Sequence, residues 1–350
     1  MKISKNHPYL PVKMIKAKDC ILWDENEREY LDLHGGNGAI SIGHNHSDFL
    51  NSFHNPSQDP FNSTESKRIL IQEKLNALLN QKNYKMHLCH SAEEANETAL
   101  KIAFSHTGKK QGIAFHGSSH THLNMSLLDY DLDQVKKMIL EKEIGAVIYE
   151  PIQVSRGITL PNNEFLRELR EVCSRNKVLF IVNEVESGFG RTGKFFAHQH
   201  AEIRADLITF SKGIGLDIPM GGILIYPEIE IENEISKIEL KEPNLVHTAI
   251  LATLEIIENE HLIQNADEIG FYISRALNRY PKINDIRGRG LLMGIEFDFP
   301  IAEMVRNLAE KHRIIVGSSN KNVLHLTPPL TLKKAYVDKF LNALEEEILK

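Results

Sequence analysis

Four short apolar segments in the middle of the chain, each followed directly by a polar residue, constrain the fold more than any other feature. The segments are 112–115, 146–149, 178–182 and 207–210, and the polar residues past their ends are His116, Glu150, Asn183 and Lys212. Continuous apolar runs of this length are typical of strands buried on both faces, which predicts a largely parallel sheet covered by helices. Because the carboxyl ends of parallel strands meet at one edge, we expect the four polar side chains there, where open α/β sheets bind ligands.

Helical patterns lie between and after these strands. The stretch 164–176 comes after Asn163, which suits a helix N-cap, and its apolar residues form one stripe. Near the C-terminus, Phe340, Leu341 and Leu344 mark the inward face of an amphipathic helix. Helices are expected over 93–105, 164–176, 245–260 and 336–349, and a loop running into a strand over 287–297.

Composition narrows the class of protein. With 350 residues the chain suggests two domains, and its net charge of 41 − 47 = −6 gives no support to nucleic-acid or anionic-membrane binding. No apolar run is long enough to span a bilayer, and the first residues lack an apolar signal core. Three cysteines without a CxxC pair argue against a disulfide framework or a structural zinc site. These features predict a cytoplasmic α/β enzyme.

A series of short motifs occurs in a fixed order along the chain. The motifs are Tyr30–Gly36, Gly43–His46, Ser91–Glu97, Phe115–Gly117, Glu150–Gln153, Glu184–Lys194, Ser211–Gly213, Arg287–Leu291 and Pro328–Leu330. In this order they resemble the class III aminotransferases, and within that class the acetylornithine aminotransferases of arginine biosynthesis. The resemblance extends from residue 13 to the C-terminus.

The resemblance implies a pyridoxal 5'-phosphate (PLP) enzyme of fold type I, a homodimer with active sites at the subunit interface. The large domain has a mostly parallel central sheet, and a smaller α+β domain is built from both chain ends. Its expected segments are 1–45 in the small domain, 46–244 in the large cofactor-binding domain and 245–350 in the small domain.

The resemblance also implies a role for particular residues. Lys212 forms the Schiff base with PLP, Asn183 contacts the ring nitrogen, and Phe115 stacks on the ring. The remaining cofactor-binding candidates are Ser91, Ala92 and Glu93 at the phosphate, with His116, Val185 and Glu186, and the substrate-binding candidates are Ser118, Glu150 and His325. The chemistry itself asks for a partly desolvated lysine at the rim of a sheet, so that its amine is neutral and nucleophilic. A lone lysine is more often a solvated surface group, but the strand before Lys212 and the glycines after it favour the active-site interpretation.

Several of these positions depart from the family's pattern. Asn183 replaces an aspartate that keeps the cofactor ring protonated, Glu186 replaces a glutamine, and Glu93 replaces a small residue in the phosphate-binding turn. Ser118 and His325 stand where the family has arginines that grip a substrate carboxylate.

Two departures concern segments rather than single positions. The family's Thr-Phe-Gly-Gly motif is absent, and its expected spacing from Lys212 falls on Glu239. The segment between Gly117 and Glu150 is also shorter than is usual in the family.

This combination is compatible with three functions. The first is PLP-dependent amino transfer from an ω-amino acid such as N-acylated ornithine to 2-oxoglutarate, with Lys212 forming the aldimine. The second is a catalytically degenerate paralogue that keeps the fold and the dimer, with weak or no PLP binding, and that pairs with an active paralogue. Like charges 4 Å apart repel by about 4 kcal/mol at an effective dielectric constant of about 20, so added carboxylates disfavour an anionic cofactor. The third is an enzyme whose acidic site accepts a cationic amine.

Other patterns have simpler interpretations. His116, His120 and His122 cluster, as do His198 and His200, but no carboxylate or cysteine lies at a zinc-like spacing, so we predict no metal site. The glycines of 288–294 precede a strand-like run rather than a helix, which argues against a dinucleotide loop. The interleaved charges of 228–241 indicate a solvated face, and Cys89 is expected to be a buried thiol. The polar residues of 54–63 predict an exposed loop.

Overall fold

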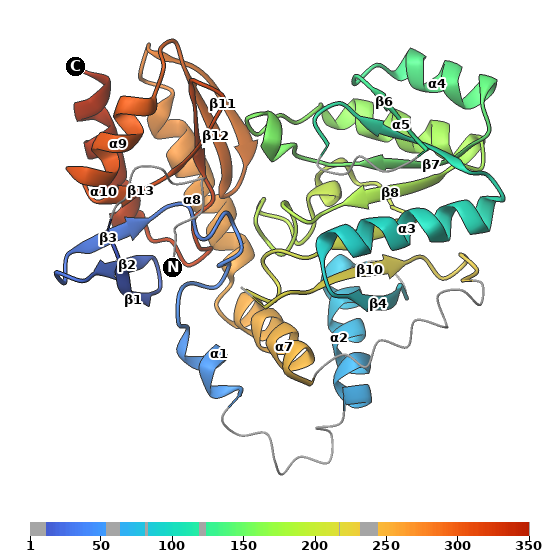
Figure 1. The fold of residues 1–350 in the computed structure, drawn as a ribbon, viewed down its shortest axis with the longest axis horizontal. Helices are drawn as coiled ribbons and strands as arrows, with labels where there is room; N and C mark the ends of the chain where they lie inside the picture. The colour runs from blue at the N-terminus through green and yellow to red at the C-terminus, as the bar shows by residue number, and fades with distance from the viewer. Residues whose placement is uncertain are drawn as a thin grey trace.

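The computed structural model describes residues 12–53, 64–80, 83–118, 124–216, 218–231 and 244–349. These residues form a seven-stranded sheet and two four-stranded sheets. Figure 1 shows the large sheet with its helices on the right and the N- and C-terminal segments together on the left. The predicted loop at 54–63, the charged segment beyond residue 231, and His120, His122 and Glu239 lie outside the described residues.

The seven-stranded sheet has the order β4-β10-β9-β8-β7-β5-β6. Its strands are β4 (Lys85–Cys89), β5 (Gln111–Phe115), β6 (Met125–Leu128), β7 (Ile144–Tyr149), β8 (Leu179–Asn183), β9 (Leu207–Phe210) and β10 (Gly221–Ile225). Strands β6, β5, β7, β8 and β9 are parallel, and β10 pairs antiparallel with both β9 and β4. Every residue of β7 and of β9 is buried. The mostly parallel sheet of the sequence prediction is therefore confirmed.

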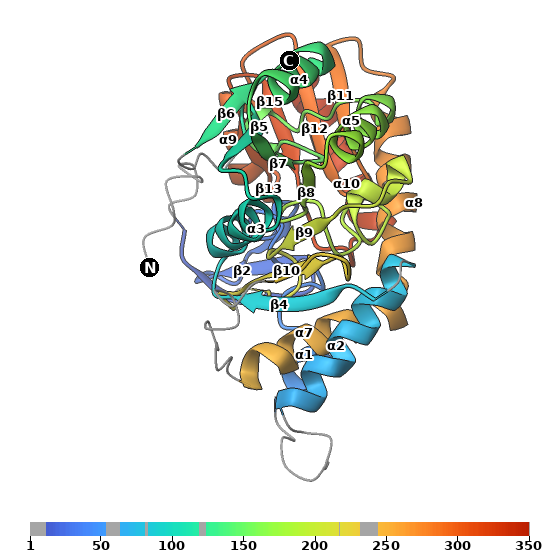
Figure 2. The same ribbon diagram turned by 90° about the vertical axis from the view of Figure 1, so that its right-hand side faces the viewer.

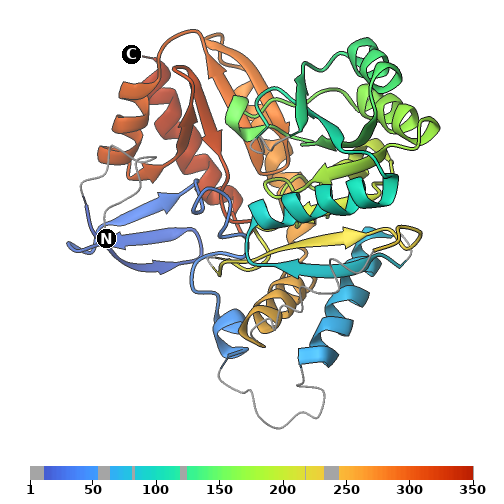
Figure 3. The same ribbon diagram turned by 45° about the vertical axis from the view of Figure 1, so that its right-hand side comes forward.

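Helices cover both faces of this sheet, and alternate strand residues point to opposite sides. Helix α3 (Ala92–Thr107) packs on the face that carries Ala146 and Ile148. Helices α4 (Leu132–Glu141) and α5 (Asn163–Arg175) bury their apolar stripes in the core that contains Val147 and Tyr149. Figure 3 shows α3 lying across the strands in front of the sheet.

The predicted N-cap of α5 is wrong by one residue. The side chain of Asn162, not of Asn163, accepts a hydrogen bond from the Phe165 N–H. The Asn163 side chain instead donates to the His200 carbonyl, because α5 begins beside the turn that contains His200.

The first small sheet joins the two ends of the chain. Strands β1 (Met14–Lys18), β2 (Ile21–Asp24) and β3 (Glu29–Asp32) form an antiparallel ribbon, and β13 (Ile314–Ile315) pairs parallel with β3. Figure 1 shows these blue strands beside the red C-terminal helices. A domain built from both chain ends agrees with this pairing, while the boundaries at residues 45 and 244 stay predictions.

The second small sheet has the order β11-β12-β15-β14. Its strands are β11 (Ile283–Arg289), β12 (Leu292–Phe297), β14 (Gly317–Ser319) and β15 (Val323–Leu326). The expected loop at the start of 287–297 is wrong, because Arg287–Arg289 already pair with Leu292–Gly294 in an antiparallel hairpin. Gly290, at a φ of +53°, allows the tight turn between these strands.

The remaining helices surround these sheets. They are α1 (Ser47–Asn51), α2 (Thr64–Leu79), α7 (Asn244–Asn259), α8 (Leu262–Leu277), α9 (Ala302–Glu310) and α10 (Lys334–Ile348), with short 3₁₀ turns η1 (Val154–Arg156) and η2 (Ala197–Ala201). Figure 2 shows α2 and α7 beside strand β4. Phe340, Leu341 and Leu344 are buried on α10, as predicted. None of the helices in the described part of the chain has the length and apolar character needed to cross a membrane.

Two further observations bear on stability and redox state. Cys20, Cys89 and Cys173 are all buried and free, and burial raises the pKa of the Cys173 thiol to about 12.

Arg191 is 3% exposed and donates to the carbonyls of Pro328 and Gly38. It therefore connects the loop after β8 to the N-terminal and the C-terminal segments of the chain. Burial lowers the pKa of Arg191 to about 10, which leaves the guanidinium charged at neutral pH.

Candidate functional site

The polar residues predicted at one edge of the sheet do lie there. Glu150 comes after β7, Asn183 ends β8 and Lys212 lies just past β9, and these three strands are adjacent and parallel. The Asn183 side-chain amide donates to Glu150 Oε1 at 3.3 Å, and both side chains are buried. The carboxyl edge of the sheet is thus a polar site with an amine, an amide and a carboxylate.

Lys212 forms the closest charged contact of the site. Its Nζ lies 2.6 Å from Glu186 Oε1, and each side chain is 30% exposed. Both residues are predicted to lie near the cofactor, and in the structure they contact one another. The ammonium is therefore held by a carboxylate in a partly desolvated position.

The turn at Ser91–Glu93 follows β4, which β10 separates from β9 and Lys212 in the sheet. The Ser91 hydroxyl accepts a hydrogen bond from the Glu94 N–H and so caps α3, while Glu93 is exposed. The first N–H groups of a helix, here those of Ala92 and Glu93, have no partner within the helix. They form, with the positive end of the helix dipole, a site suited to a phosphate group.

The start of β10 connects this turn to the end of β9, the strand that precedes Lys212. Gly221 pairs with Cys89 and Gly222 with Phe210, so β10 lies between the turn and the end of β9. A Cβ on Gly221 would lie 2.2 Å from the Ser91 carbonyl oxygen, so only glycine permits this approach.

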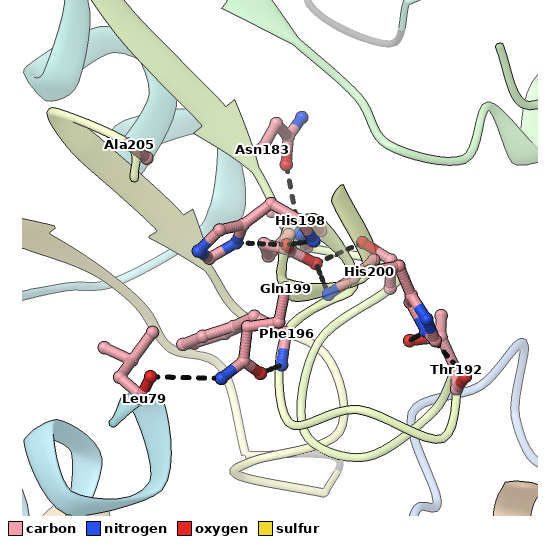
Figure 4. Close-up of polar contacts among 12 residues, drawn as sticks. Leu79, Asn183, Thr192, Phe196, His198, Gln199, His200 and Ala205 are labelled. Atoms are coloured by element: carbon pink, nitrogen blue, oxygen red, sulfur yellow. Dashed lines mark hydrogen bonds and ion pairs between the residues drawn. The ribbon is translucent and has the colours of Figure 1, made fainter. Parts of the chain in front are cut away.

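The loop after β8 is held by the buried carboxylate of Glu184. It accepts hydrogen bonds from the Ser187 hydroxyl, from the Ala197 and His198 N–H groups and from His198 Nδ1, at 2.5–2.9 Å. Burial by itself raises the pKa of this carboxyl, but the bonds from His198 and Ser187 outweigh it and the net pKa is lowered. Figure 4 shows this network with His198 and Asn183 on its two sides.

The network fixes the neighbours of Glu184 as well. The side-chain oxygen of Asn183 accepts a hydrogen bond from the Val185 N–H at 3.1 Å, which orients the Asn183 amide toward Glu150. Val185 is 8% exposed. His200 lies on the far side of the loop and bonds the Thr192 carbonyl, so His198 and His200 serve the fold (Figure 4). No group of three or more metal-ligating side chains occurs among the residues that the structure describes.

Phe115 lies deeper in the core than stacking on a cofactor requires. It is fully buried, and its ring stacks on Tyr130 with centroids 4.9 Å apart. Tyr149 and Phe165 pack edge-on against it. His116, the next residue, is exposed at the strand end. The stacking role of Phe115 and the cofactor contact of His116 stay predictions.

Ser118 and His325, the two positions where the family has an arginine, differ in burial. Ser118 is half-buried, and its hydroxyl accepts a hydrogen bond from Gln153 Nε2 at 3.3 Å. His325 is 7% exposed and shares a hydrogen bond with Ser319 Oγ at 2.5 Å. Burial, with the nearby charge of Arg287, lowers the pKa of His325 to about 4. The ring is therefore neutral at pH 7 and brings no charge for a carboxylate.

Some residues of this region were not among the predicted site residues. Gln153 is fully buried beside Ser118, and Arg156 on η1 reaches back to the turn at His116 and Gly117. Glu184 anchors a loop through His198, 14 positions away. Only the tertiary contacts reveal these roles, because each pair is distant in sequence.

Comparison with known proteins identifies the family. The family model described as aminotransferase class III matches residues 2–131 and 127–348. The chain belongs to the class III aminotransferases. Acetylornithine aminotransferase of Nitrosomonas europaea is 30% identical over 96% of this chain and 95% of its own length. That of Methanosarcina mazei is 29% identical over 96% and 91%.

Solved structures show the same fold. An ornithine δ-aminotransferase of Plasmodium falciparum has a TM-score of 0.85 at 23% identity, covering 99% of this chain and 95% of its own. An acetylornithine aminotransferase of Elizabethkingia anophelis has a TM-score of 0.84 at 23% identity, with coverages of 99% and 96%. The large parallel sheet is that of the fold type I enzymes. None of these four relatives is named as a non-catalytic protein, so the alternative of a catalytically degenerate paralogue gains no support from them.

Class III aminotransferases use PLP, and the residues of this aminotransferase fit that cofactor at three points. The partly exposed amine of Lys212 is available for covalent attachment once it leaves Glu186. The N-terminus of α3 suits the phosphate. The buried amide of Asn183 suits the ring nitrogen, although it carries no charge.

Proposed function

We propose that this class III aminotransferase moves an amino group from an N-acylated ω-amino acid, such as acetylornithine, to 2-oxoglutarate. The observation that carries the proposal is the position of Lys212 at the carboxyl edge of the sheet, partly buried and in contact with Glu186. The named relatives with the greatest sequence similarity reported above, both acetylornithine aminotransferases, support the choice of donor.

Each residue of the site has a definite task in this proposal. PLP would supply an electron sink for the deprotonation of the substrate. Lys212 Nζ would hold the cofactor, and its amine is the group that would move the proton. The N–H groups of Ala92 and Glu93 bind the phosphate, and Asn183 orients the ring.

Two changes in the site bear on the proposed reaction, one on its rate and one on attachment of the cofactor. Asn183 offers a neutral hydrogen bond where a carboxylate would form a charge-assisted one, worth about 1.5–3 kcal/mol. Each 1.36 kcal/mol in the barrier is a tenfold change in rate, so we expect turnover slower by one to two orders of magnitude than with an aspartate. Glu186 opposes attachment by holding the Lys212 ammonium.

Visible absorption of the purified protein with PLP tests the proposal. Borohydride reduction and peptide mapping should place the cofactor on Lys212, and acetylornithine should then change the spectrum and yield glutamate from 2-oxoglutarate. Lys212→Ala is the control, because it keeps the fold and removes the amine. A folded protein that acquires no colour and no label on Lys212 would refute the cofactor assignment and favour a degenerate paralogue.

We also propose a homodimer whose active sites lie at the subunit interface. The same proposal includes a large cofactor-binding domain over 46–244 and a small domain made of 1–45 and 245–350. Sedimentation of the purified chain should give about 80 kDa, twice the monomer mass of 39.8 kDa. A monomer that gains activity only with a second, different chain would overturn it in favour of a heterodimer with a paralogue.

A further inference from the structure

Arg156, on η1, reaches the turn after β5, where Ser118 stands in place of the family's arginine. Arg156 Nη1 donates to the His116 carbonyl at 3.2 Å. A Cβ on Gly117 would lie 2.1 Å from Arg156 Cδ, so the stem of the arginine lies directly on the glycine. The Ser155 hydroxyl also donates to the Gly117 carbonyl, at 2.5 Å. The turn η1 is therefore docked on the end of β5 at several points.

The guanidinium of Arg156 keeps capacity for a ligand. It is exposed, and none of the carboxylates in the described ranges forms an ion pair with it. One of its five N–H donors bonds the His116 carbonyl. The nearby Arg287, by contrast, is paired with Glu296 at 2.7 Å and with Asp285 at 3.5 Å.

Buried polar atoms beside Arg156 also have unused capacity. Gln153 Oε1 and the Tyr130 hydroxyl are buried and have no hydrogen-bond partner among the described residues. Tyr130 stacks on Phe115 and Gln153 bonds Ser118, so both lie at the end of β5, where Arg156 bonds the His116 carbonyl. Buried polar atoms are almost always paired, so two unpaired ones at the same strand end as the Arg156 guanidinium point to a polar ligand.

We propose that Arg156 binds the carboxylate of the amino donor, in place of the arginine that the family pattern puts at position 118. The assignment rests on the proposed function and specifies its substrate class, an N-acylated amino acid rather than a diamine. A guanidinium matches a carboxylate with two parallel hydrogen bonds, which lysine or neutral histidine does not. Ser118 and Gln153 then line the turn around the bound carboxylate.

Binding of an unreactive analogue tests this without turnover. N-acetyl-L-norvaline has the carboxylate and the acylated amine of acetylornithine but no terminal amino group. Calorimetry on the PLP-loaded protein should show binding that Arg156→Gln weakens by about 10- to 100-fold, the loss expected for one charge-assisted contact. Arg156→Lys should recover only part of it. Arg175→Gln, an exposed arginine at the far end of α5, should bind as wild type does.

Kinetics separate recognition from chemistry. Wild type should prefer acetylornithine to N-acetylputrescine, which lacks only the carboxylate, and Arg156→Gln should reduce the ratio of their kcat/KM values by the same factor. The change should lie in KM rather than in kcat. Equal binding of N-acetyl-L-norvaline by wild type and Arg156→Gln, or no binding by wild type, would overturn the assignment. If binding behaves as expected but acetylornithine is not turned over, the proposed function fails and the carboxylate site stands.

Discussion

Replacing Glu186 with glutamine should strengthen PLP binding. The cofactor needs the unprotonated amine of Lys212, whereas the structure holds the ammonium 2.6 Å from the Glu186 carboxylate. Attachment therefore requires this contact to break. Glutamine has nearly the same shape and can still hydrogen-bond the amine, but it does not favour the charged form.

The structure sets the size of the effect. At 2.6 Å and an effective dielectric constant of about 20, the bare attraction is about 6 kcal/mol. Both side chains are 30% exposed, so water screens the pair and each group loses some hydration on forming it. A net contribution of about 1.5–3 kcal/mol, that of a hydrogen bond between charged groups, is the appropriate figure. It corresponds to PLP binding about 10- to 150-fold tighter in Glu186→Gln.

Titration of the cofactor-free protein with PLP, followed by visible absorbance, measures this change. The unfolding free energy of the cofactor-free variant gives a second measure and should fall by the same amount, about 1.5–3 kcal/mol, since the ion pair is lost. Glu303→Gln, which breaks an exposed pair with Arg306 on α9, is the matched control and should leave PLP affinity within about threefold of wild type. Unchanged or weaker PLP binding in Glu186→Gln would refute the reasoning and show that the carboxylate assists attachment.

Three further predictions concern stability. The pKa of His325 is about 4 in the folded protein and about 6.5 in the unfolded chain. The unfolded chain therefore binds the proton more readily, so the contribution of the neutral ring to the unfolding free energy is complete above pH ~6.5 and declines as the pH falls. Between pH 7 and pH 5 wild type should therefore lose about 2 kcal/mol more than His325→Asn in urea unfolding. Arg170→Ala leaves the Asp206 carboxylate partly buried and unpaired and should lower the unfolding free energy by about 3 kcal/mol, against less than about 1 for Arg175→Ala, which breaks an exposed pair. Glu184→Gln removes the acceptor that holds the loop after β8 and should speed amide hydrogen exchange over 185–198 while costing about 2–4 kcal/mol.

Each prediction has an outcome that contradicts it. Equal losses for wild type and His325→Asn would mean that the histidine titrates alike in both states. Similar destabilisation in the Arg170→Ala and Arg175→Ala variants would show that burial of the Asp206 pair adds nothing. Unchanged exchange in the Glu184→Gln loop would mean that backbone bonds alone hold it.

The sequence predicted the strands that lead to the site but missed others in the same sheet. β7, β8 and β9 are continuous apolar runs because they are buried on both faces, and that burial is visible in composition. β6 is only partly buried at the edge of the sheet, and Ser126 interrupts its apolar residues, so it carries no such signal. β10 contains two glycines because of its close contacts with Ser91 and Phe210, which local propensity does not predict.

By itself the sequence determined the sheet class and the edge of the sheet at which Lys212 lies, because these depend on which short segments are apolar and on the polar residues just past their ends. The tertiary structure decided the partners. Lys212 meets Glu186 across 26 positions, and Arg156 reaches His116 across 40. Such contacts depend on how strands and turns pack in three dimensions, and no local pattern of residues specifies which distant side chain will face which.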